Sequence, residues 1–421
     1  MKKYFKLMSL FLGLMICTPA FVACGDDDDD DAPAPAAETP QQVVPETEIT
    51  GGWKINISAN AVVYGGGTQQ ISYLESMAFN SDGSFVTEAG ENSDYNTYKT
   101  KYEGTWSKLG SDRVVVSLTA AYSAQDGNYT PDQYFQAHND TLGYFFKGNA
   151  LFCESIVNGG YFAYTRDGNL PFSGFGDYSN SPVLGIWQGQ DFAWDGTPID
   201  LLYEMRSDGT FFCTQDNHQG WSEGTAGYYI IDGGRIMFIN YYFISKMNSE
   251  DNKWDIVGFR MWGGQWFNFR VEDNKLYGDG FMSMSDEVDY LVKQGTTSGK
   301  TIVGHWKSTE TIYYEVPETE DEYWEIEQNG AVRHWWIRNG QFASGTMGTY
   351  DLTTADNKTY IVCHWSHFLV DSGNNANPSQ GEETGREPHN YTLQYVYSNI
   401  ADALLVQWSG SDYFERFKRI N

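Results

Sequence analysis

The stretch AFNSDGSF at residues 78–85 recurs as EMRSDGTF at residues 204–211 and, in weaker form, as EIEQNGAV at residues 325–332. In each copy, apolar residues flank an Asp-Gly or Asn-Gly pair. Both residues of such a pair adopt positive φ readily, so the pattern predicts a β-hairpin. Three copies of one hairpin in a chain of 421 residues indicate an internally repeated, strand-rich protein.

Other landmarks surround each hairpin in a fixed order. A Gly-x-Trp motif precedes it, ending at Trp53, Trp187 and Trp306. A glycine that leads into an aromatic strand follows it, at Gly104, Gly227 and Gly348. Each unit then closes on an aromatic strand that carries basic residues, within residues 161–166, 289–293 and 412–419. The repeated order predicts three copies of one domain.

The breaker-rich stretches 167–182 and 295–300 are typical of linkers, which divides the chain into repeats at residues 49–170, 183–294 and 301–421. Each repeat is too long for a propeller blade or a solenoid turn. Eight short strands with tight turns fill such a length, and closing them into a barrel removes the exposed sheet edges. The sequence therefore predicts an all-β protein of three tandem small antiparallel β-barrels. β-sandwiches with the same hairpins are the alternative.

The N-terminus has a different character. Residues 1–23 combine three early lysines with an apolar run that is too short for a comfortable membrane span, as in a signal peptide. The segment FVAC at residues 21–24 resembles a bacterial lipobox. That resemblance implies a diacylglyceryl group on the Cys24 thiol and cleavage just before this residue. Plain secretion is the alternative.

An acidic and proline-rich segment follows at residues 24–48. The aspartates at 26–31 repel one another and keep the chain extended, which predicts a tether. A cluster of this kind directly after Cys24 also resembles the signal that exports Bacteroidota lipoproteins to the outer face of the outer membrane. The protein is therefore expected to face the cell exterior, held to the membrane by its lipid. Contiguous aspartates lack the loop geometry of calcium motifs.

Composition excludes several classes of partner. The net charge of −29 argues against nucleic-acid binding and against docking on anionic lipid head groups. With Cys17 in the signal peptide and Cys24 lipidated, only Cys153, Cys213 and Cys363 remain. An odd set of three cannot form a full disulfide framework, so stability must come from burial.

The order of landmarks resembles the lipocalin-like domains of Bacteroidota surface lipoproteins. The resemblance spans residues 49–421 and implies that a tryptophan plugs one end of each barrel, at Trp53, Trp187 and Trp306. It also implies that a cation on the last strand covers each plug, at Arg166, at Lys293 and at either Lys418 or Arg419. A cation over an indole face contributes about 0.5 to 2 kcal/mol.

No recognised catalytic or phosphate-binding motif occurs, and neither a cofactor nor a metal is predicted. The third repeat is rich in histidine, but strand alternation places His364 and His367 on opposite faces, and it separates His367 widely from Cys363. A pair of catalytic carboxylates depends on a spatial separation that the sequence does not reveal. The protein is therefore expected not to be an enzyme, with a surface glycosidase as the alternative.

Clustered tryptophans are the candidates for ligand contacts. Trp262 and Trp266 flank a Gly-Gly turn that could lie at a barrel mouth. Trp335 and Trp336 are adjacent, so only one of them can face a barrel interior. These four predict stacking on a ligand. The functional prediction is a lipid-anchored surface protein that binds a small apolar molecule or a glycan without catalysis, and a purely structural role is a further alternative.

Overall fold

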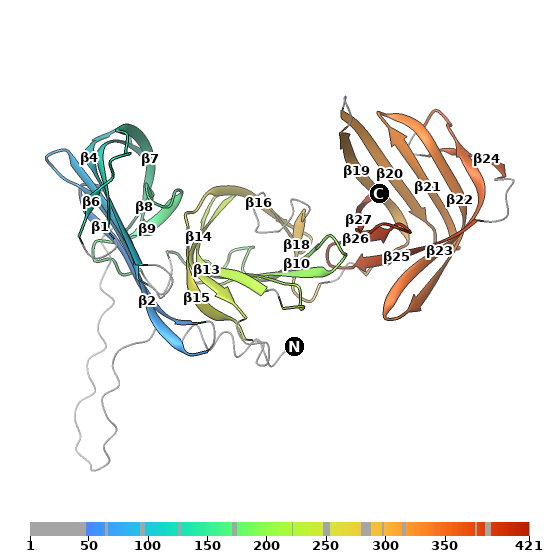
Figure 1. The fold of residues 1–421 in the computed structure, drawn as a ribbon, viewed down its shortest axis with the longest axis horizontal. Helices are drawn as coiled ribbons and strands as arrows, with labels where there is room; N and C mark the ends of the chain where they lie inside the picture. Colours follow the sequence, from blue (N-terminus) through green and yellow to red (C-terminus); the bar gives the residue numbers. More distant parts are fainter. Residues whose placement is uncertain are drawn as a thin grey trace, which may run out of the picture. The chain divides into compact units, whose positions relative to one another are not determined.

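The computed structural model describes residues 48–420, except 64–65, 93–96, 125–127, 171–174, 221, 247–252, 279–287, 297–298, 314–316, 375–376 and 384–388. All of its regular elements are strands, and they form three antiparallel β-barrels in tandem (Figure 1). The barrel prediction is therefore confirmed. Residues 1–47, which include the signal peptide, Cys24 and nearly all of the tether, lie outside the described part.

The first barrel contains β1 (Gly51–Val62), β2 (Thr68–Phe79), β3 (Ser84–Asn92), β4 (Thr97–Lys108), β5 (Arg113–Ala124), β6 (Thr130–Pro131), β7 (His138–Lys147), β8 (Ala150–Glu154) and β9 (Tyr161–Tyr164). Its strand order is β1-β2-β3-β4-β5-β7-β8-β9, with β6 added to β5. Lys54 and Thr165 exchange backbone hydrogen bonds of 2.8 and 2.9 Å, which brings β1 beside the end of β9 and closes the ring.

The second barrel contains β10 (Gly185–Phe192), β11 (Pro198–Met205), β12 (Thr210–Asp216), β13 (Ser222–Asp232), β14 (Arg235–Ser245), β15 (Asp255–Trp262), β16 (Trp266–Glu272), β17 (Lys275–Gly278) and β18 (Tyr290–Lys293). Its order is β13-β12-β11-β10-β18-β17-β16-β14, and pairing of β13 with β14 closes it. β15 lies outside this ring, on β14.

The third barrel contains β19 (Gly304–Tyr313), β20 (Pro317–Ile326), β21 (Ala331–Arg338), β22 (Gln341–Ala355), β23 (Lys358–Val370), β24 (Ser379–Glu383), β25 (His389–Ser398), β26 (Ala403–Gln407) and β27 (Glu415–Ile420). Its order is β22-β21-β20-β19-β27-β26-β25-β23, and pairing of β22 with β23 closes it. Each barrel is thus a ring of eight strands, and one further strand pairs with a single strand of that ring.

Contacts between residues divide the chain into two compact units. Of the described residues, the first unit contains those within 48–185, 203–214 and 220–269, and the second contains those within 186–202, 215–219 and 270–420. The third barrel lies wholly in the second unit, together with β10, β17 and β18.

The repeated landmarks have the same geometry in each barrel. The carbonyl of the hairpin glycine accepts a backbone hydrogen bond from an aromatic residue on a later strand, at Trp106, Tyr229 and Tyr350. The glycine near that aromatic lies at a β-bulge. A Cβ there would stand within about 2 Å of a carbonyl oxygen of the neighbouring strand, at Gly104, Gly227 and Gly348. Only glycine allows this close approach, which explains the recurring landmark.

Candidate functional site

A buried indole fills the end of each barrel where its first strand begins. The three tryptophans of the Gly-x-Trp motifs have no exposed surface: Trp53, Trp187 and Trp306. A cation lies over each ring, Arg166 at 3.7 Å, Lys293 at 5.5 Å and Arg419 at 4.1 Å from the ring centroid. Of the two residues that the sequence left open in the third barrel, Arg419 occupies this position. Each indole and its cation therefore close that end of the barrel interior.

Trp262 and Trp266 have separate environments. Trp262 is 53% exposed and lies beneath the Arg260 guanidinium, which is 4.5 Å from its ring centroid. Trp266 instead packs on Phe145 of the first barrel, with ring centroids 5.9 Å apart. The Gly-Gly turn between the two tryptophans pairs with Tyr161 through two backbone hydrogen bonds of 2.7 and 2.9 Å. This turn thus joins two barrels within the first compact unit.

Trp335 and Trp336 point to opposite faces of β21, as alternation along a strand requires. Trp335 packs with Ile337 and Leu369 in a small cluster apart from the main core, and its ring stacks on Tyr323 at 5.1 Å. Trp336 contacts His334, a neighbour of the core residue Trp324, at a ring separation of 4.0 Å. Of the adjacent pair, Trp336 is the residue that faces the barrel interior.

The interior of the third barrel changes from apolar to polar with distance from the plug. The strand register sets Trp306 opposite Trp324, and Trp324 opposite His334. The next inward-facing layer sets Ser308 opposite Glu322, and Glu322 opposite Trp336. A carboxyl group therefore stands one layer above the plug, where the apolar core of the barrel ends.

Glu322 is the centre of a network that we call the acid–indole cluster, consisting of Glu322, His334, Glu415, Trp324, Trp336 and Trp408. His334 Nε2 lies 2.6 Å from Glu322 Oε1. The indole N–H groups of Trp324 and Trp336 each donate to Glu322 at 3.2 Å. Trp408 packs against His334 with ring centroids 5.0 Å apart. Glu322 and His334 are buried, whereas Trp336, Trp408 and Glu415 are half-buried, so the cluster reaches the surface on one side.

The hydrogen bonds of the acid–indole cluster indicate which of its groups carry a proton and which accept one. Burial lowers the pKa of His334 far below its ordinary value, so the ring is neutral and donates from Nε2. Glu322 therefore accepts bonds from three rings, and it also hydrogen-bonds Glu415. Two carboxyl groups bond to each other only when one is protonated. Burial and then the charge of Glu322 raise the pKa of Glu415, which makes Glu415 the proton donor of the pair.

The first barrel holds a carboxyl group at the equivalent position. Glu75, like Glu322, stands four residues before the apolar residue that precedes the hairpin turn. It is fully buried and accepts hydrogen bonds of 2.6 to 3.0 Å from four side chains, Tyr73, Ser155, Asn158 and Tyr164. Burial, followed by the nearby Glu75, raises the pKa of both tyrosines, which keeps them protonated donors. This carboxyl group has no contact with solvent, and its role is to accept hydrogen bonds from donors inside the first barrel.

Sequence reasoning did not single out Glu75, Glu322, Glu415 or His334. The available signal was the position in the repeat. The residue four places before the apolar residue that precedes the turn is Glu75 in the first repeat, Glu322 in the third and Leu201 in the second. Comparison of the three repeats in register would have identified a buried acid in two of them. The partner acid Glu415 has no such signal, because it lies on the last strand.

The three cysteines outside the N-terminal segment and His364 have separate environments. Cys153, Cys213 and Cys363 are buried free thiols. His364 hydrogen-bonds Asn390 and Asp351 at 2.8 and 3.0 Å on the barrel exterior. Within the described ranges, no group of three or more His, Cys, Asp or Glu side chains is placed to hold a metal ion.

Cys24, the predicted site of lipid attachment, lies outside the described residues. Among the residues that are described, no helix has the length and apolar character needed to cross a membrane. A scan against protein-family models finds no match for this chain, and a search of curated proteins finds none either.

Proposed function

We propose that this protein is a lipid-anchored surface lipoprotein that binds a glycan, without catalysis, at the acid–indole cluster of its third barrel. The observation that carries the proposal is the combination of half-buried indoles with carboxyl groups one layer above the tryptophan plug of that barrel. Binding sites for small molecules commonly join aromatic surface to a few polar groups that fix orientation.

The chemistry of the cluster favours a sugar over a purely apolar ligand. Trp336 and Trp408 are half-buried with ring centroids 6.3 Å apart, and the exposed part of these rings would offer flat apolar surface for the C–H face of a sugar ring. Glu415 lies beside them and can accept or donate a hydrogen bond to a hydroxyl group. An apolar ligand would remove water from the carboxyl groups without replacing its hydrogen bonds, which costs free energy. A neutral sugar supplies both kinds of contact.

The spacing of the acids supports binding rather than hydrolysis. Glycosidase carboxylates stand about 5 to 9 Å apart, which leaves room for the scissile bond or a water molecule. Glu322 and Glu415 instead hydrogen-bond each other. The oxygens of Glu322 also accept hydrogen bonds from the rings of His334, Trp324 and Trp336. This arrangement suits a fixed hydrogen-bonding group better than a nucleophile.

Exchange of Trp336 for alanine should weaken glycan binding at least tenfold, or ~1.4 kcal/mol, because it removes a stacking face. The full-length protein, purified in detergent, would first be screened on an array of neutral oligosaccharides, and the strongest ligand would then be titrated by calorimetry. Trp262→Ala is the matched control, because Trp262 is also accessible but lies on the second barrel. Unchanged affinity in Trp336→Ala, or turnover of a chromogenic glycoside that Glu415→Gln abolishes, contradicts the proposal.

The lipid anchor is tested separately. Cys24→Ala should lose a metabolic palmitate label and leave the membrane fraction, because no other group is proposed to hold the protein there. Cys17→Ala, in the signal peptide, should keep the label. Deletion of residues 26–31 should leave the label intact but protect the protein from protease added outside the cell. Labelling of Cys24→Ala would refute the anchor, and unchanged protease sensitivity would make the acidic run a spacer only.

A further inference from the structure

A cavity of about 580 Å³ lies at the plugged end of the third barrel, within the second compact unit. We call it the plug-end cavity, because the carbonyl of its lining residue Ile302 accepts a hydrogen bond from the Trp306 indole at 2.8 Å. Its volume is typical of small-molecule sites, which range from about 300 to 1,000 Å³. Three parts of the chain line it: residues 300–302, which lead into β19, the end of the β22–β23 hairpin with Leu352 and residues 357–359, and residues 394–397 of β25.

The β22–β23 hairpin forms one wall of the plug-end cavity because it extends past its neighbour. The ladder between β21 and β22 ends at Thr349, whereas β22 continues to Ala355. Leu352 pairs with the buried core residue Ile361, so both side chains lie on the inward face of the hairpin. Leu352 is nevertheless 49% exposed. The hairpin therefore presents apolar surface that a ligand can bury.

The other two repeats cover the corresponding position with their own side chains. The residue four places after the bulge glycine is Lys108 in the first repeat, Ile231 in the second and Leu352 in the third. Lys108 forms an ion pair of 3.0 Å with Glu48, in the segment that leads into β1. In the second repeat, the Tyr178 hydroxyl accepts a hydrogen bond from the backbone N–H of Ile231 at 3.4 Å. In both repeats, the segment before the first strand thus contacts the hairpin.

The third repeat has no residues for either contact. Its segment 295–301 reads GTTSGKT and contains neither an acid nor an aromatic residue. Leu352 also lacks the charge through which Lys108 holds Glu48. The plug-end cavity is therefore a feature in which the third repeat differs from the other two by sequence.

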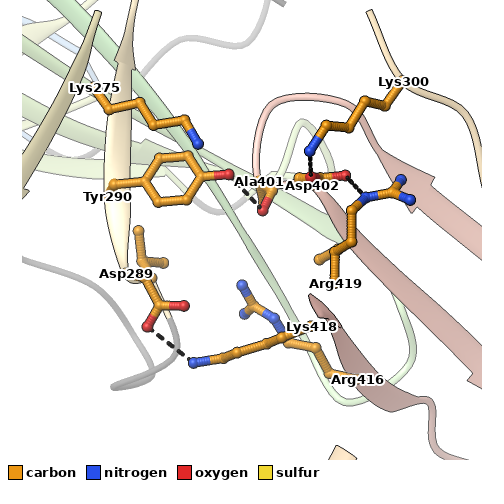
Figure 2. A pocket seen from close by; sticks show the side chains of 11 residues that line it. Lys275, Asp289, Tyr290, Lys300, Ala401, Asp402, Arg416, Lys418 and Arg419 are labelled. Atoms are coloured by element: carbon orange, nitrogen blue, oxygen red, sulfur yellow. Dashed lines mark hydrogen bonds and ion pairs between the residues drawn. The ribbon is translucent and has the colours of Figure 1, made fainter. Parts of the chain in front are cut away.

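The wall formed by residues 300–302 is held to the barrel by polar contacts. The Thr301 carbonyl accepts a hydrogen bond from the Arg419 guanidinium at 2.6 Å. Asp402 accepts from Lys300 at 3.0 Å and from Arg419 at 2.8 Å (Figure 2). Because these contacts use the protein's own groups, the wall is in place before a ligand binds. A preformed wall lowers the entropic cost of binding.

The lining of the plug-end cavity combines apolar surface with a cation. Ile302 is buried, Tyr395 is half-buried and Leu352 is exposed, so apolar residues lie at every depth. Lys358 is exposed, and its side chain forms no hydrogen bond or ion pair with the residues that the structure describes. In a chain of net charge −29, most of the surface repels anions, so a cation beside apolar surface favours an acidic ligand here.

We propose that the plug-end cavity binds a carboxylic acid with an apolar body, either a fatty acid or an aromatic acid. The apolar body would lie against Leu352 and Tyr395, and the carboxylate would pair with Lys358. An ion pair with an exposed lysine contributes little by itself, so most of the affinity would come from burial of apolar surface. The carboxylate would instead distinguish the ligand from neutral molecules of the same shape.

This site is separate from the acid–indole cluster. The cluster begins one layer above the Trp306 plug, whereas the plug-end cavity lies beside Ile302, which precedes the plug in the chain. The cluster offers carboxyl groups, which suit a neutral sugar, and the cavity offers a lysine, which suits an acid. Loss of one site should therefore leave binding at the other unchanged.

Calorimetric titration of the full-length protein with decanoate and with 2-naphthoate tests the proposal, with the heats of a detergent-only titration subtracted. At least one acid should bind saturably with a stoichiometry of one. Binding of decanoate alone would identify an acyl chain as the apolar body, and binding of 2-naphthoate alone would identify an aromatic ring. Decan-1-ol should bind several-fold more weakly than decanoate if decanoate is the ligand. Absence of saturable binding by both acids overturns the proposal.

Two variants locate the acid. Leu352→Asp should weaken binding at least tenfold, because it places a carboxylate on the apolar wall. Lys358→Gln should weaken it several-fold and should remove any preference for decanoate over decan-1-ol. Leu109→Asp is the matched control, because Leu109 is a leucine of the first barrel with 50% exposure, and it should bind normally. Trp336→Ala should also bind normally.

Thermal unfolding of each variant separates loss of the site from loss of the fold. Normal binding in Leu352→Asp, with thermal unfolding unchanged, would place the acid elsewhere and refute the assignment. If Leu352→Asp is unstable, Lys358→Gln decides, because this exposed side chain has no described partner to lose. Unchanged affinity for the acid in a stable Lys358→Gln variant would contradict the proposed pairing of its carboxylate.

Discussion

Exchange of Glu75 for leucine is expected to lower the free energy of unfolding by at least ~3 kcal/mol, because it removes the shared acceptor of three buried hydroxyl donors and of the half-buried Asn158 amide. A buried donor that loses its partner costs about 1 to 3 kcal/mol, and the apolar side chain recovers only part of that loss. Urea denaturation of the full-length protein, followed by circular dichroism, measures the change.

A variant that removes only one of the four hydrogen bonds separates the effect of the hydrogen bonds from the effect of repacking around Glu75. Tyr164→Phe removes one donor and leaves the carboxyl group with three others, so its effect should be about 1 kcal/mol. If Glu75→Leu costs no more than Tyr164→Phe, the four hydrogen bonds do not act as the structure implies. The first barrel would then owe its stability to its apolar core alone.

Exchange of Glu415 for glutamine should have the opposite effect and should make the protein more stable at alkaline pH. Burial raises the pKa of Glu415 from an ordinary value near 4.5 to about 8. A group with a raised pKa in the folded state contributes its stability fully below pH 4.5 and loses it as the pH rises through about 8. Glutamine is neutral throughout and still donates to Glu322, so the variant escapes this loss.

The measurement is the difference in free energy of unfolding between Glu415→Gln and the parent protein at several values between pH 5 and 9. We expect the difference to favour the variant increasingly as the pH rises. The contribution of His334 to the pH dependence of the free energy of unfolding has the opposite sign, because its lowered pKa destabilises the fold at acid pH. This contribution is common to both proteins, so it cancels in the difference. Glu272→Gln, on an exposed pair, should give a flat difference. A flat result for Glu415→Gln would refute the shared proton.

The repeated local features were predictable because each acts within one hairpin or one strand. The Asp-Gly turns, the Gly-x-Trp plugs and the bulge glycines recur in order, and three barrels follow from them. Alternation likewise predicted that only one of Trp335 and Trp336 faces inward. It could not identify which, because that depends on where β21 joins the register of β20.

The sites depend on contacts that no local pattern encodes. Glu322 lies on β20 and Glu415 on β27, and they come together because β19 pairs with both of these strands. Trp266 packs on Phe145 because the Gly-Gly turn beside it meets a glycine of the first barrel. Asp289 of the second repeat pairs with Lys418 of the third at 2.9 Å. Each of these requires the tertiary structure.

The proposal of a glycan site at the third barrel is tested most directly by a crystal structure of the protein with its strongest-binding neutral oligosaccharide. We expect a sugar ring stacked on Trp336 or Trp408, with one hydroxyl within hydrogen-bonding distance of Glu415. A sugar bound elsewhere, with the acid–indole cluster unchanged and uncovered, would contradict the proposal.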